Sequence, residues 1–328
     1  MNRKVLILKP RLDLPFKRFG LEKRKPHIEP IRVHWQNFVD KLAEYHGMRK
    51  DKVVIIEEQK WKFCERFVRS GFNPDIAYVP HTDKKLFNGR EECRYYMQTV
   101  FPWLFTVDKD GWGGTSSHSK LGWYEVAPDD DATFEEFRKR AIKGESKYNQ
   151  PLAEFDNPFE DGFIFVPLQL PHDETIKYHS KVGVINFAVA IMKWAYEKRI
   201  NVVFKNHPAN PNSLEDVRLF AEQYSNAHWL EHQVNIHSLF AQAKAVYVVN
   251  SGSAKEAMLH DVPIVRFGLA DYNMAVIEGD IRDLERTWQK VLNLERATMK
   301  ENYRTFYNWF INRICYDSRN IGSFLKLR

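Results

Sequence analysis

The chain has 328 residues, of which 44% are hydrophobic and 28% charged, so its composition excludes a disordered or fibrous protein and its length allows two domains. No apolar run approaches the roughly 18 residues of a membrane span, and the run 5–8 is too short for a signal peptide, so we expect a cytoplasmic protein with no membrane span. The three cysteines lack C-x-x-C spacing and indicate neither a disulfide framework nor a zinc site.

The first 25 residues are strongly basic. They contain nine lysines and arginines against two acids, whereas the net charge of the whole chain is +6. A charge run of this kind is commonly a solvated loop. Alternatively, it binds an anionic partner near the first strand, because clustered Lys and Arg supply phosphate contacts. The candidates for that contact are Lys9, Arg11, Lys17 and Arg18.

Short strands and helices alternate through the first half of the chain. Apolar and β-branched runs predict strands, and apolar residues near one face predict helices between them. This alternation favours an α/β domain with a parallel sheet covered on both faces. The strands are predicted at 4–8, 53–57, 76–79 and 103–107, and the helices at 31–45, 61–70 and 91–99.

A glycine-rich segment, residues 108–120, follows the fourth predicted strand. Its three glycines predict a flexible loop in which Trp112 and His118 are available to contact an acceptor molecule. Asp108-x-Asp110 matches a short metal-binding pattern that is common by chance, and a role as loop cap or acceptor contact is the better interpretation. Asp129–Asp131 is predicted to cap a helix at 134–142.

Residues 144–161 have little periodicity and two prolines, and we interpret them as a linker between domains. The predicted domains are therefore 1–150 and 151–328. In the second, a strand at 163–167 precedes Gln169, His172 and Asp173, and a largely apolar helix follows at 175–198. Asp173 occupies the position of a helix N-cap. Beyond residue 268 the chain is predicted to be helical almost to its end, with apolar positions at Trp288, Val291, Phe306, Trp309, Phe310 and Ile314.

Polar residues follow two further strands predicted in the second half. The run 202–204 leads into Lys205, Asn206 and His207, and the run 245–249 leads into Asn250, Ser251 and Ser253. Ligands of open α/β sheets lie outside the carboxyl ends of parallel strands. We therefore expect a ligand site where these strands end.

The second of these loops enters a good helix former directly. Free backbone N–H groups at such a helix start favour a phosphate, and Gly252 lets the backbone approach it closely. The alternative is a capping box, in which Ser253 and Glu256 close the helix start without any ligand.

Three segments together resemble the capsule polysaccharide biosynthesis family, which includes bacterial Kdo transferases. They are K-x-H-P at 205–208, S-G-S-x-x-E-A at 251–257 and VPLQLPHDETI at 166–176, and the likeness spans about residues 162–272. The resemblance implies a GT-B fold: two facing Rossmann-like domains with parallel sheets and a C-terminal helix that crosses back. The sequence departs from the family at Ala254, where a second glycine is common, and this leaves the identity of the donor open.

The resemblance implies a glycosyltransferase whose donor is a CMP- or UDP-linked sugar. His207-Pro208 would contact the donor phosphate, Ser251–Ser253 the nucleotide, and Glu256 the ribose hydroxyls. The full set of predicted donor-binding residues is Gln169, His172, Lys205, His207, Pro208, Asn250, Ser251, Gly252, Ser253 and Glu256.

The catalytic hypothesis needs no metal or other cofactor. Lys205, His207 and the helix start would neutralise charge on the leaving phosphate. A carboxylate would activate the acceptor hydroxyl, and the candidates are Asp13, Asp108 and Asp173.

The acceptor is expected to be anionic, best matched by a capsule or surface glycan. One alternative is a DNA glycosyltransferase that flips out and modifies hydroxymethylated bases of phage DNA. A second is a non-catalytic nucleic-acid-binding protein with a degenerate donor site, because 14% aromatic residues beside a basic segment suit base stacking. The sequence leaves the oligomeric state and the stereochemistry of transfer open.

Overall fold

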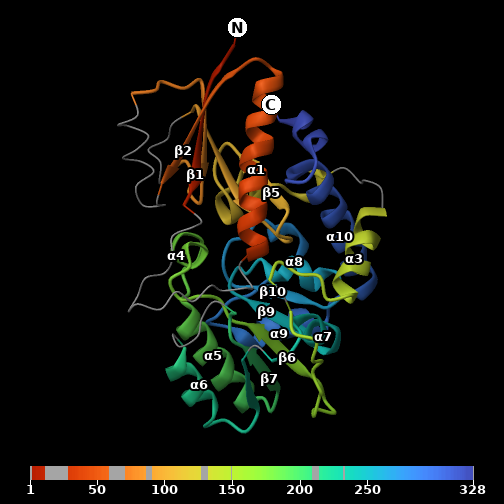
Figure 1. Cartoon of the computed structure of the whole chain (residues 1–328). Coiled ribbons are helices and arrows are strands. Elements are labelled where there is room, and N and C mark those ends of the chain that lie inside the picture. The colour runs from red at the N-terminus through yellow and green to blue at the C-terminus, as the bar shows by residue number, and fades with distance from the viewer. Residues whose placement is uncertain are drawn as a thin grey trace. The chain divides into compact units, whose positions relative to one another are not determined.

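The computed structural model describes residues 2–11, 29–58, 71–85, 91–126, 132–148, 150–208, 214–231 and 233–327 (Figure 1). Asp13, Lys17, Arg18, Asp129–Asp131 and the helix predicted at 61–70 lie outside these ranges. The chain divides into two compact units, one formed by residues 1–117 with 313–328 and the other by residues 118–312. Residues 118–150, which the sequence analysis assigns to the first domain, are thus grouped with the second unit.

The first unit contains a six-stranded sheet in the order β12-β5-β4-β3-β1-β2. The pairs β1–β2, β1–β3 and β3–β4 are parallel, as the alternation predicted. The pairs β4–β5 and β5–β12 are antiparallel, so the sheet departs from the expected parallel arrangement at one edge. The strands are β1 Lys4–Pro10, β2 Lys52–Glu58, β3 Ile76–Pro80, β4 Cys93–Gln98, β5 Leu104–Asp108 and β12 Cys315–Asp317.

The helix predicted at 91–99 is wrong, because this segment forms strand β4. Cys93, Tyr95 and Tyr96 are fully buried, and the strand pairs with β3 on one side and β5 on the other. Aromatic side chains suit a pleated surface that is covered on both faces. In so short an apolar segment, this tertiary setting decides between helix and strand.

Helix α1, Glu29–Met48, includes the helix predicted at 31–45 and lies along the first sheet (Figure 1). Its Trp35, Phe38 and Leu42 belong to the core on that face, where Phe38 stacks on Phe105 of β5 with ring centroids 4.3 Å apart. Three short 3₁₀ turns follow β5, at Gly113–Thr115, Ser117–Lys120 and Trp123–Glu125.

The second unit contains a six-stranded sheet in the order β11-β10-β9-β6-β7-β8, and all its pairs are parallel. Along the chain, β6 is followed by β7 and β8 on one side and by β9, β10 and β11 on the other. This is the Rossmann strand order, and the crevice at its reversal point lies above the carboxyl ends of β6 and β9. The strands are β6 Phe163–Pro167, β7 Asn201–Lys205, β8 Ala227–Leu230, β9 Ala245–Val248, β10 Ile264–Arg266 and β11 Ile277–Glu278.

The helix predicted at 175–198 is two helices, α4 Glu174–His179 and α5 Val184–Glu197. Between them, the Ser180 hydroxyl bonds to the backbone N–H and carbonyl of Val182, which turns the chain before α5 starts. The remaining helices are α3 Ala132–Ile142, α6 Glu215–Ala221, α7 Ile236–Gln242, α8 Ser253–Met258, α9 Leu284–Leu292 and α10 Arg296–Trp309.

After α10 the chain passes through a π-helical turn, Phe310–Ile314, and returns to the first unit as β12 and a 3₁₀ turn, Ile321–Lys326. The prediction of helix beyond residue 268 is therefore only partly right, because the α-helices begin at α9, after β11, and end at this turn. Within the ranges that the structure describes, no helix combines the length and the apolar character that crossing a bilayer requires.

Candidate functional site

Two amide side chains join the loops that follow β6 and β9, at the reversal point of the second sheet. Gln169 Nε2 donates to Asn250 Oδ1 at 3.0 Å, and Gln169 Oε1 accepts from the Asn250 backbone N–H at 3.1 Å. Asn250 Nδ2 also donates to the carbonyl of Thr175, at 2.8 Å. Both side chains are buried. These hydrogen bonds therefore hold the loops after β6 and β9 in a fixed position relative to each other.

Asp173 acts as a helix cap, as its alternative interpretation predicted. Its carboxylate accepts hydrogen bonds from the backbone N–H and the hydroxyl of Thr175, both at 2.9 Å, and so starts α4. His172, immediately before it, is exposed.

Lys205 ends β7 as a buried ammonium group. The residue is 5% exposed and stands opposite Pro167, the last residue of β6. Burial lowers the pKa of Lys205 to about 8, while Glu231 acts in the opposite direction. Among the residues that the structure describes, no carboxylate forms an ion pair with it. Because a buried charge is costly without a partner, this position favours an anionic ligand.

The nearest acid, Glu231, is engaged by Asn206. Asn206 Nδ2 donates to Glu231 Oε2 at 3.0 Å, and its Oδ1 accepts from the backbone N–H of His207 at 2.9 Å. This fixes the turn that carries His207 and Pro208, which are both half-buried. The imidazole of His207 meets the ring of Tyr148 edge-on, with centroids 5.2 Å apart.

The loop after β9 does not form the capping box that was one of the two sequence hypotheses. Helix α8 has only six residues and its N-cap is Gly252, which has no side chain to cap it. The hydroxyl of Ser251 accepts from the backbone N–H of Ser253 at 3.3 Å. The hydroxyls of Ser251 and Ser253 bond to each other at 2.8 Å. The capping box between Ser253 and Glu256 is therefore wrong, because Glu256 points to another segment. With so short a helix, we give its N-terminus little weight as an anion site.

Glu256 holds the segment 145–148, which the sequence analysis treated as a linker. Its Oε2 accepts from the Ser146 hydroxyl at 2.5 Å, and the backbone N–H of Lys147 donates to the same carboxylate. The residue is 4% exposed, and burial raises the pKa of Glu256 to about 7, against the effect of these two hydrogen bonds.

Lys147 brings a second ammonium group to the site. Burial and the nearby charge of Lys255 lower the pKa of Lys147 to about 8, whereas Asp173, Glu256 and Asp271 act to raise it. Its side chain makes no ion pair with the described part of the chain. Because Asp173 follows β6 and Glu256 lies on α8, after β9, Lys147 lies at the reversal point of the sheet. Lys205 ends the adjacent strand β7 on the same carboxyl edge.

Lys255, by contrast, is fully neutralised. Its ammonium lies 2.7 and 2.8 Å from the two carboxylate oxygens of Asp271, and both residues are buried. Tyr272, which follows, donates its hydroxyl to the carbonyl of Ser251 at 2.6 Å. This buried pair anchors α8 and gives Lys255 a structural role.

Sequence reasoning missed Ser146, Lys147 and Tyr148. Their segment has no apolar period, so nothing in it indicates a direction or a neighbour. The one available signal was a basic residue next to an aromatic residue at 147–148.

Asp108, in the first unit, organises its own loop. Its Oδ1 accepts from the backbone N–H groups of Asp110, Gly111 and Ser117 at 2.8, 3.1 and 3.0 Å, and its Oδ2 accepts from the Ser117 hydroxyl. Both oxygens are thus engaged. The geometry supports the interpretation of Asp108 as a loop cap.

The remaining predicted contacts do not converge on one surface. Trp112 and His118 are 4% and 3% exposed, so both rings are buried. Lys9 pairs with Glu57 of the neighbouring strand at 2.8 Å, and Arg11 is exposed. Within the described ranges, no group of three or more His, Cys, Asp or Glu side chains could hold a metal ion.

Solved structures share this fold at low sequence identity. The β-Kdo 2,4 transferase of KpsC from Thermosulfurimonas dismutans covers 93% of this chain and 90% of its own at 12% identity, with a TM-score of 0.51. The β-Kdo 2,7 transferase from the same organism covers 99% and 98% at 14% identity, with a TM-score of 0.48. A UDP-GlcNAc 2-epimerase from Neisseria meningitidis, bound to UDP-GlcNAc, covers 98% and 98% at 12% identity, with a TM-score of 0.41. The GT-B-like fold expected from the sequence is confirmed.

The match to a family profile covers more of the chain than the resemblance noted above. A search of curated proteins found no match. The profile described as capsule polysaccharide biosynthesis protein matches residues 128–312, which is more than half of the chain. This range includes the missed segment 145–148 as well as every predicted residue between Gln169 and Glu256. The chain belongs to the capsule polysaccharide biosynthesis protein family.

Proposed function

We propose that the chain is a glycosyltransferase that moves a sugar from a nucleotide-sugar donor to an anionic capsule or surface glycan. One observation carries the proposal: Lys147 and Lys205 border the crevice of a Rossmann-ordered sheet without ion-pair partners among the described residues. Membership of the family points to a capsule glycan. The Kdo transferases of KpsC, with which the chain shares its fold, support group transfer.

In the proposed reaction, the bond between the sugar and the nucleotide phosphate breaks as the acceptor hydroxyl attacks the sugar carbon. Negative charge then grows on the leaving phosphate, where Lys147, Lys205 and His207 stabilise it. The acceptor hydroxyl loses its proton to a carboxylate. The lysines supply the positive charge that the phosphate needs, so the proposed reaction includes no metal or other cofactor.

Of the remaining predicted donor-binding residues, some are accessible to a ligand and others support the loops that carry them. Ser251 and Ser253 offer hydroxyls beside the crevice for the nucleotide, and exposed His172 stands at the end of the β6 loop. Gln169 and Asn250 support these loops from below. Glu256 positions Ser146 and Lys147 rather than contacting ribose directly.

The proposed proton acceptor is a carboxylate whose oxygens are not all used in hydrogen bonds to its own loop. Asp108 uses both of its oxygens within its own loop. Among the described residues, Asp173 uses only Oδ1, which accepts from the backbone N–H and the hydroxyl of Thr175. Asp173, through its other oxygen, and Asp13, which lies outside the described residues, stay the proposed bases.

The DNA-modifying alternative rests on the basic segment, whose residues 12–25 also lie outside the described ranges. No observation on the described residues favours it or the nucleic-acid-binding alternative, and the family favours a glycan.

The test is mass spectrometry of products from CMP- and UDP-sugars, each offered with an anionic oligosaccharide and with hydroxymethylated DNA. A mass increase of one sugar on the oligosaccharide would support the proposal. Transfer to DNA alone would show that the acceptor is DNA and not a glycan. Absence of both transfer and donor hydrolysis under every condition would refute the proposal that the chain is a glycosyltransferase.

A further inference from the structure

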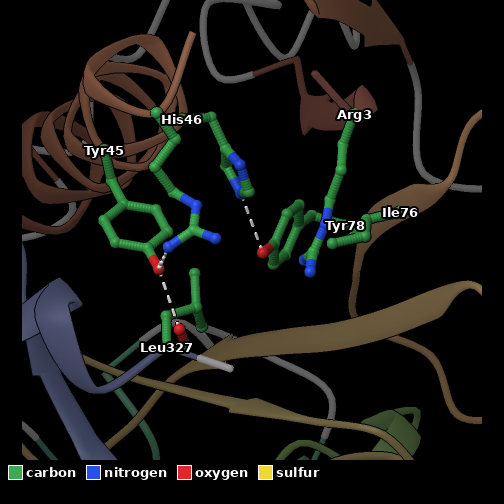
Figure 2. Close-up of a pocket in the computed structure, with 7 residues that line it drawn as sticks. Arg3, Tyr45, His46, Ile76, Tyr78 and Leu327 are labelled. Atoms are coloured by element: carbon green, nitrogen blue, oxygen red, sulfur yellow. Dashed lines mark hydrogen bonds between the residues drawn. The ribbon is translucent and has the colours of Figure 1, made fainter. Parts of the chain in front are cut away.

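The first unit contains a pocket at the edge of its sheet where β1 and β3 begin (Figure 2). Arg3 directly precedes β1, Ile76 opens β3, and Arg49 follows the end of α1. The two strands are parallel, so these residues share the amino edge of the sheet. Ligands of α/β sheets ordinarily bind at the opposite, carboxyl edge. The pocket therefore lies at the opposite edge of the sheet from any ligand site at the carboxyl ends of the strands.

The cavity has a volume of about 320 Å³, which suits a small molecule. It is lined by Arg3, Tyr45, His46, Arg49, Ile76, Tyr78 and Leu327.

Both charged residues of this lining are cations. The guanidinium of Arg3 makes no hydrogen bond or ion pair with the described residues. Arg49 Nε lies 4.0 Å from Asp51 Oδ2, and this acid is already engaged. Its Oδ1 accepts from the backbone N–H of Arg3 at 2.9 Å, and its Oδ2 bonds to His46 at 2.8 Å. One Arg49 nitrogen donates to the Tyr45 hydroxyl at 3.4 Å (Figure 2). The two guanidinium groups keep further donors beside one cavity, a pattern suited to a carboxylate or phosphate.

The inner wall presents a hydrogen-bond acceptor as well. His46 Nδ1 lies against the Asp51 carboxylate and carries the ring proton, so Nε2 accepts the hydroxyl proton of Tyr78 at 3.0 Å (Figure 2). Burial lowers the pKa of His46, against the effect of Asp51, and so favours the neutral ring. With its proton directed at His46, the oxygen of Tyr78, a residue of the lining, keeps a lone pair. That lone pair can accept from a hydroxyl of a ligand.

The rest of the lining is apolar and held in place. Tyr45 donates its hydroxyl to the carbonyl of Leu327 at 2.8 Å, which fixes the ring at one side of the cavity (Figure 2). Together with Ile76 and the ring of Tyr78, it offers carbon surfaces to the body of a ligand.

We propose that this pocket binds a small hydroxylated anion, with its carboxylate or phosphate between Arg3 and Arg49 and one hydroxyl donating to Tyr78. An anionic monosaccharide has this chemistry and this size. The proposal is independent of the transfer reaction, because it concerns a different unit and requires no donor sugar.

Calorimetric titration of the full chain at low ionic strength tests it, with glucuronate, glucose 6-phosphate, sulfate and glucose as probes. We expect the two anionic sugars to bind with a Kd of about 1 mM or tighter and glucose to give no binding heat. The tighter of the two sugars tells whether a carboxylate or a phosphate is the natural group.

Three variants locate the site. R3Q and R49Q should each weaken binding of the better sugar about 10-fold or more, while R286Q, which removes the same charge from an exposed position on α9, should leave it unchanged. Y78F should weaken the sugar but not sulfate, which has no hydroxyl to donate. Circular dichroism checks that each variant is folded.

A fourth variant separates this pocket from the proposed donor site. K147M/K205M should retain full affinity for the sugar, because both lysines belong to the second unit. Absence of binding by either anionic sugar, equal binding of glucose, equal losses in R49Q and R286Q, or loss of binding in K147M/K205M would each overturn the proposal.

Discussion

At the scale of single residues, Lys205 combines burial with the absence of an ion-pair partner in the described chain. Replacing it by Met should lower the transfer rate about 10²–10³-fold, as for other positioned groups that stabilise transition-state charge. The melting temperature should stay equal or rise, because the protein no longer desolvates an ammonium group. Lys300→Met, on the exposed surface of α10, is the matched control. Full activity of Lys205→Met, or loss of activity through unfolding, would contradict the assignment.

The lowered pKa values of Lys147 and Lys205 predict an alkaline limit to activity. Only the protonated ammonium attracts phosphate, and in the free protein both groups lose their protons as the pH rises through about 8. The ratio kcat/KM, which reports on the free enzyme, should therefore fall above that pH. Lys205→Arg keeps its charge, so its alkaline fall should be less steep than that of the wild type. Identical pH profiles would exclude Lys205 from donor binding.

Asp108 provides a test between catalysis and structure. In Asp108→Asn the remaining amide oxygen can still accept from the three backbone N–H groups, so the loop should persist and the melting temperature should change little. We expect transfer to be retained within a few-fold. A loss of about 10²-fold or more in rate from a folded variant would instead identify Asp108 as the proton acceptor.

At the scale of elements, Glu256 joins α8 to the segment 145–148 and makes that link dependent on pH. Its pKa is raised from 4.5 to about 7 in the folded state, so between these values the folded protein binds more protons than the unfolded chain. The free energy of unfolding therefore falls as the pH rises from 4.5 to 7, on the order of 1–3 kcal/mol for this group.

Denaturant unfolding at pH 5 and pH 8 measures this effect. Glu256→Gln should lose this part of the pH dependence, because the amide does not titrate. Glu301→Gln, exposed on α10, should keep it. An unchanged difference between the two pH values in Glu256→Gln would show that the carboxyl titrates normally.

The elements also show what the sequence could predict. Lys205, His207, Asn250 and Ser251 could be proposed from the sequence because polar residues rarely follow buried β-branched runs without a reason. Lys147 was not found, because its contact with the site depends on Glu256, more than 100 positions later in the sequence. Strand β4 was predicted as a helix because its setting between β3 and β5, rather than its own residues, determines its conformation.

At the scale of the whole molecule, the first unit consists of two pieces of chain. Residues 313–328 contribute β12, which pairs with β5. They also contribute the fully buried Phe324, whose ring centroid lies 5.4 Å from that of Phe38 on α1. The alternation of strands and helices predicted two α/β units, but a three-residue strand so far from its partner gave no signal.

Truncation after Asn312 tests this dependence. We expect backbone amides of β1 and β5 to lose hydrogen-exchange protection, since an edge strand and a core side chain are removed. Amides of β6 and β9 should keep theirs, because the second unit is complete. Retained protection in the first unit would show that it folds without its last piece.

Because the first unit consists of two separate pieces of chain, it cannot be completed until the end of synthesis. The ribosome releases residues 1–117 first, then the 195 residues of the second unit, and only then β12. At bacterial and eukaryotic elongation rates this interval is about 10–40 s. During this interval the outer edge of β5 has no partner strand, and the aromatic residues around Phe38 are not yet covered by Phe324. A factor that binds unpaired strand edges would therefore recognise the nascent chain at this stage.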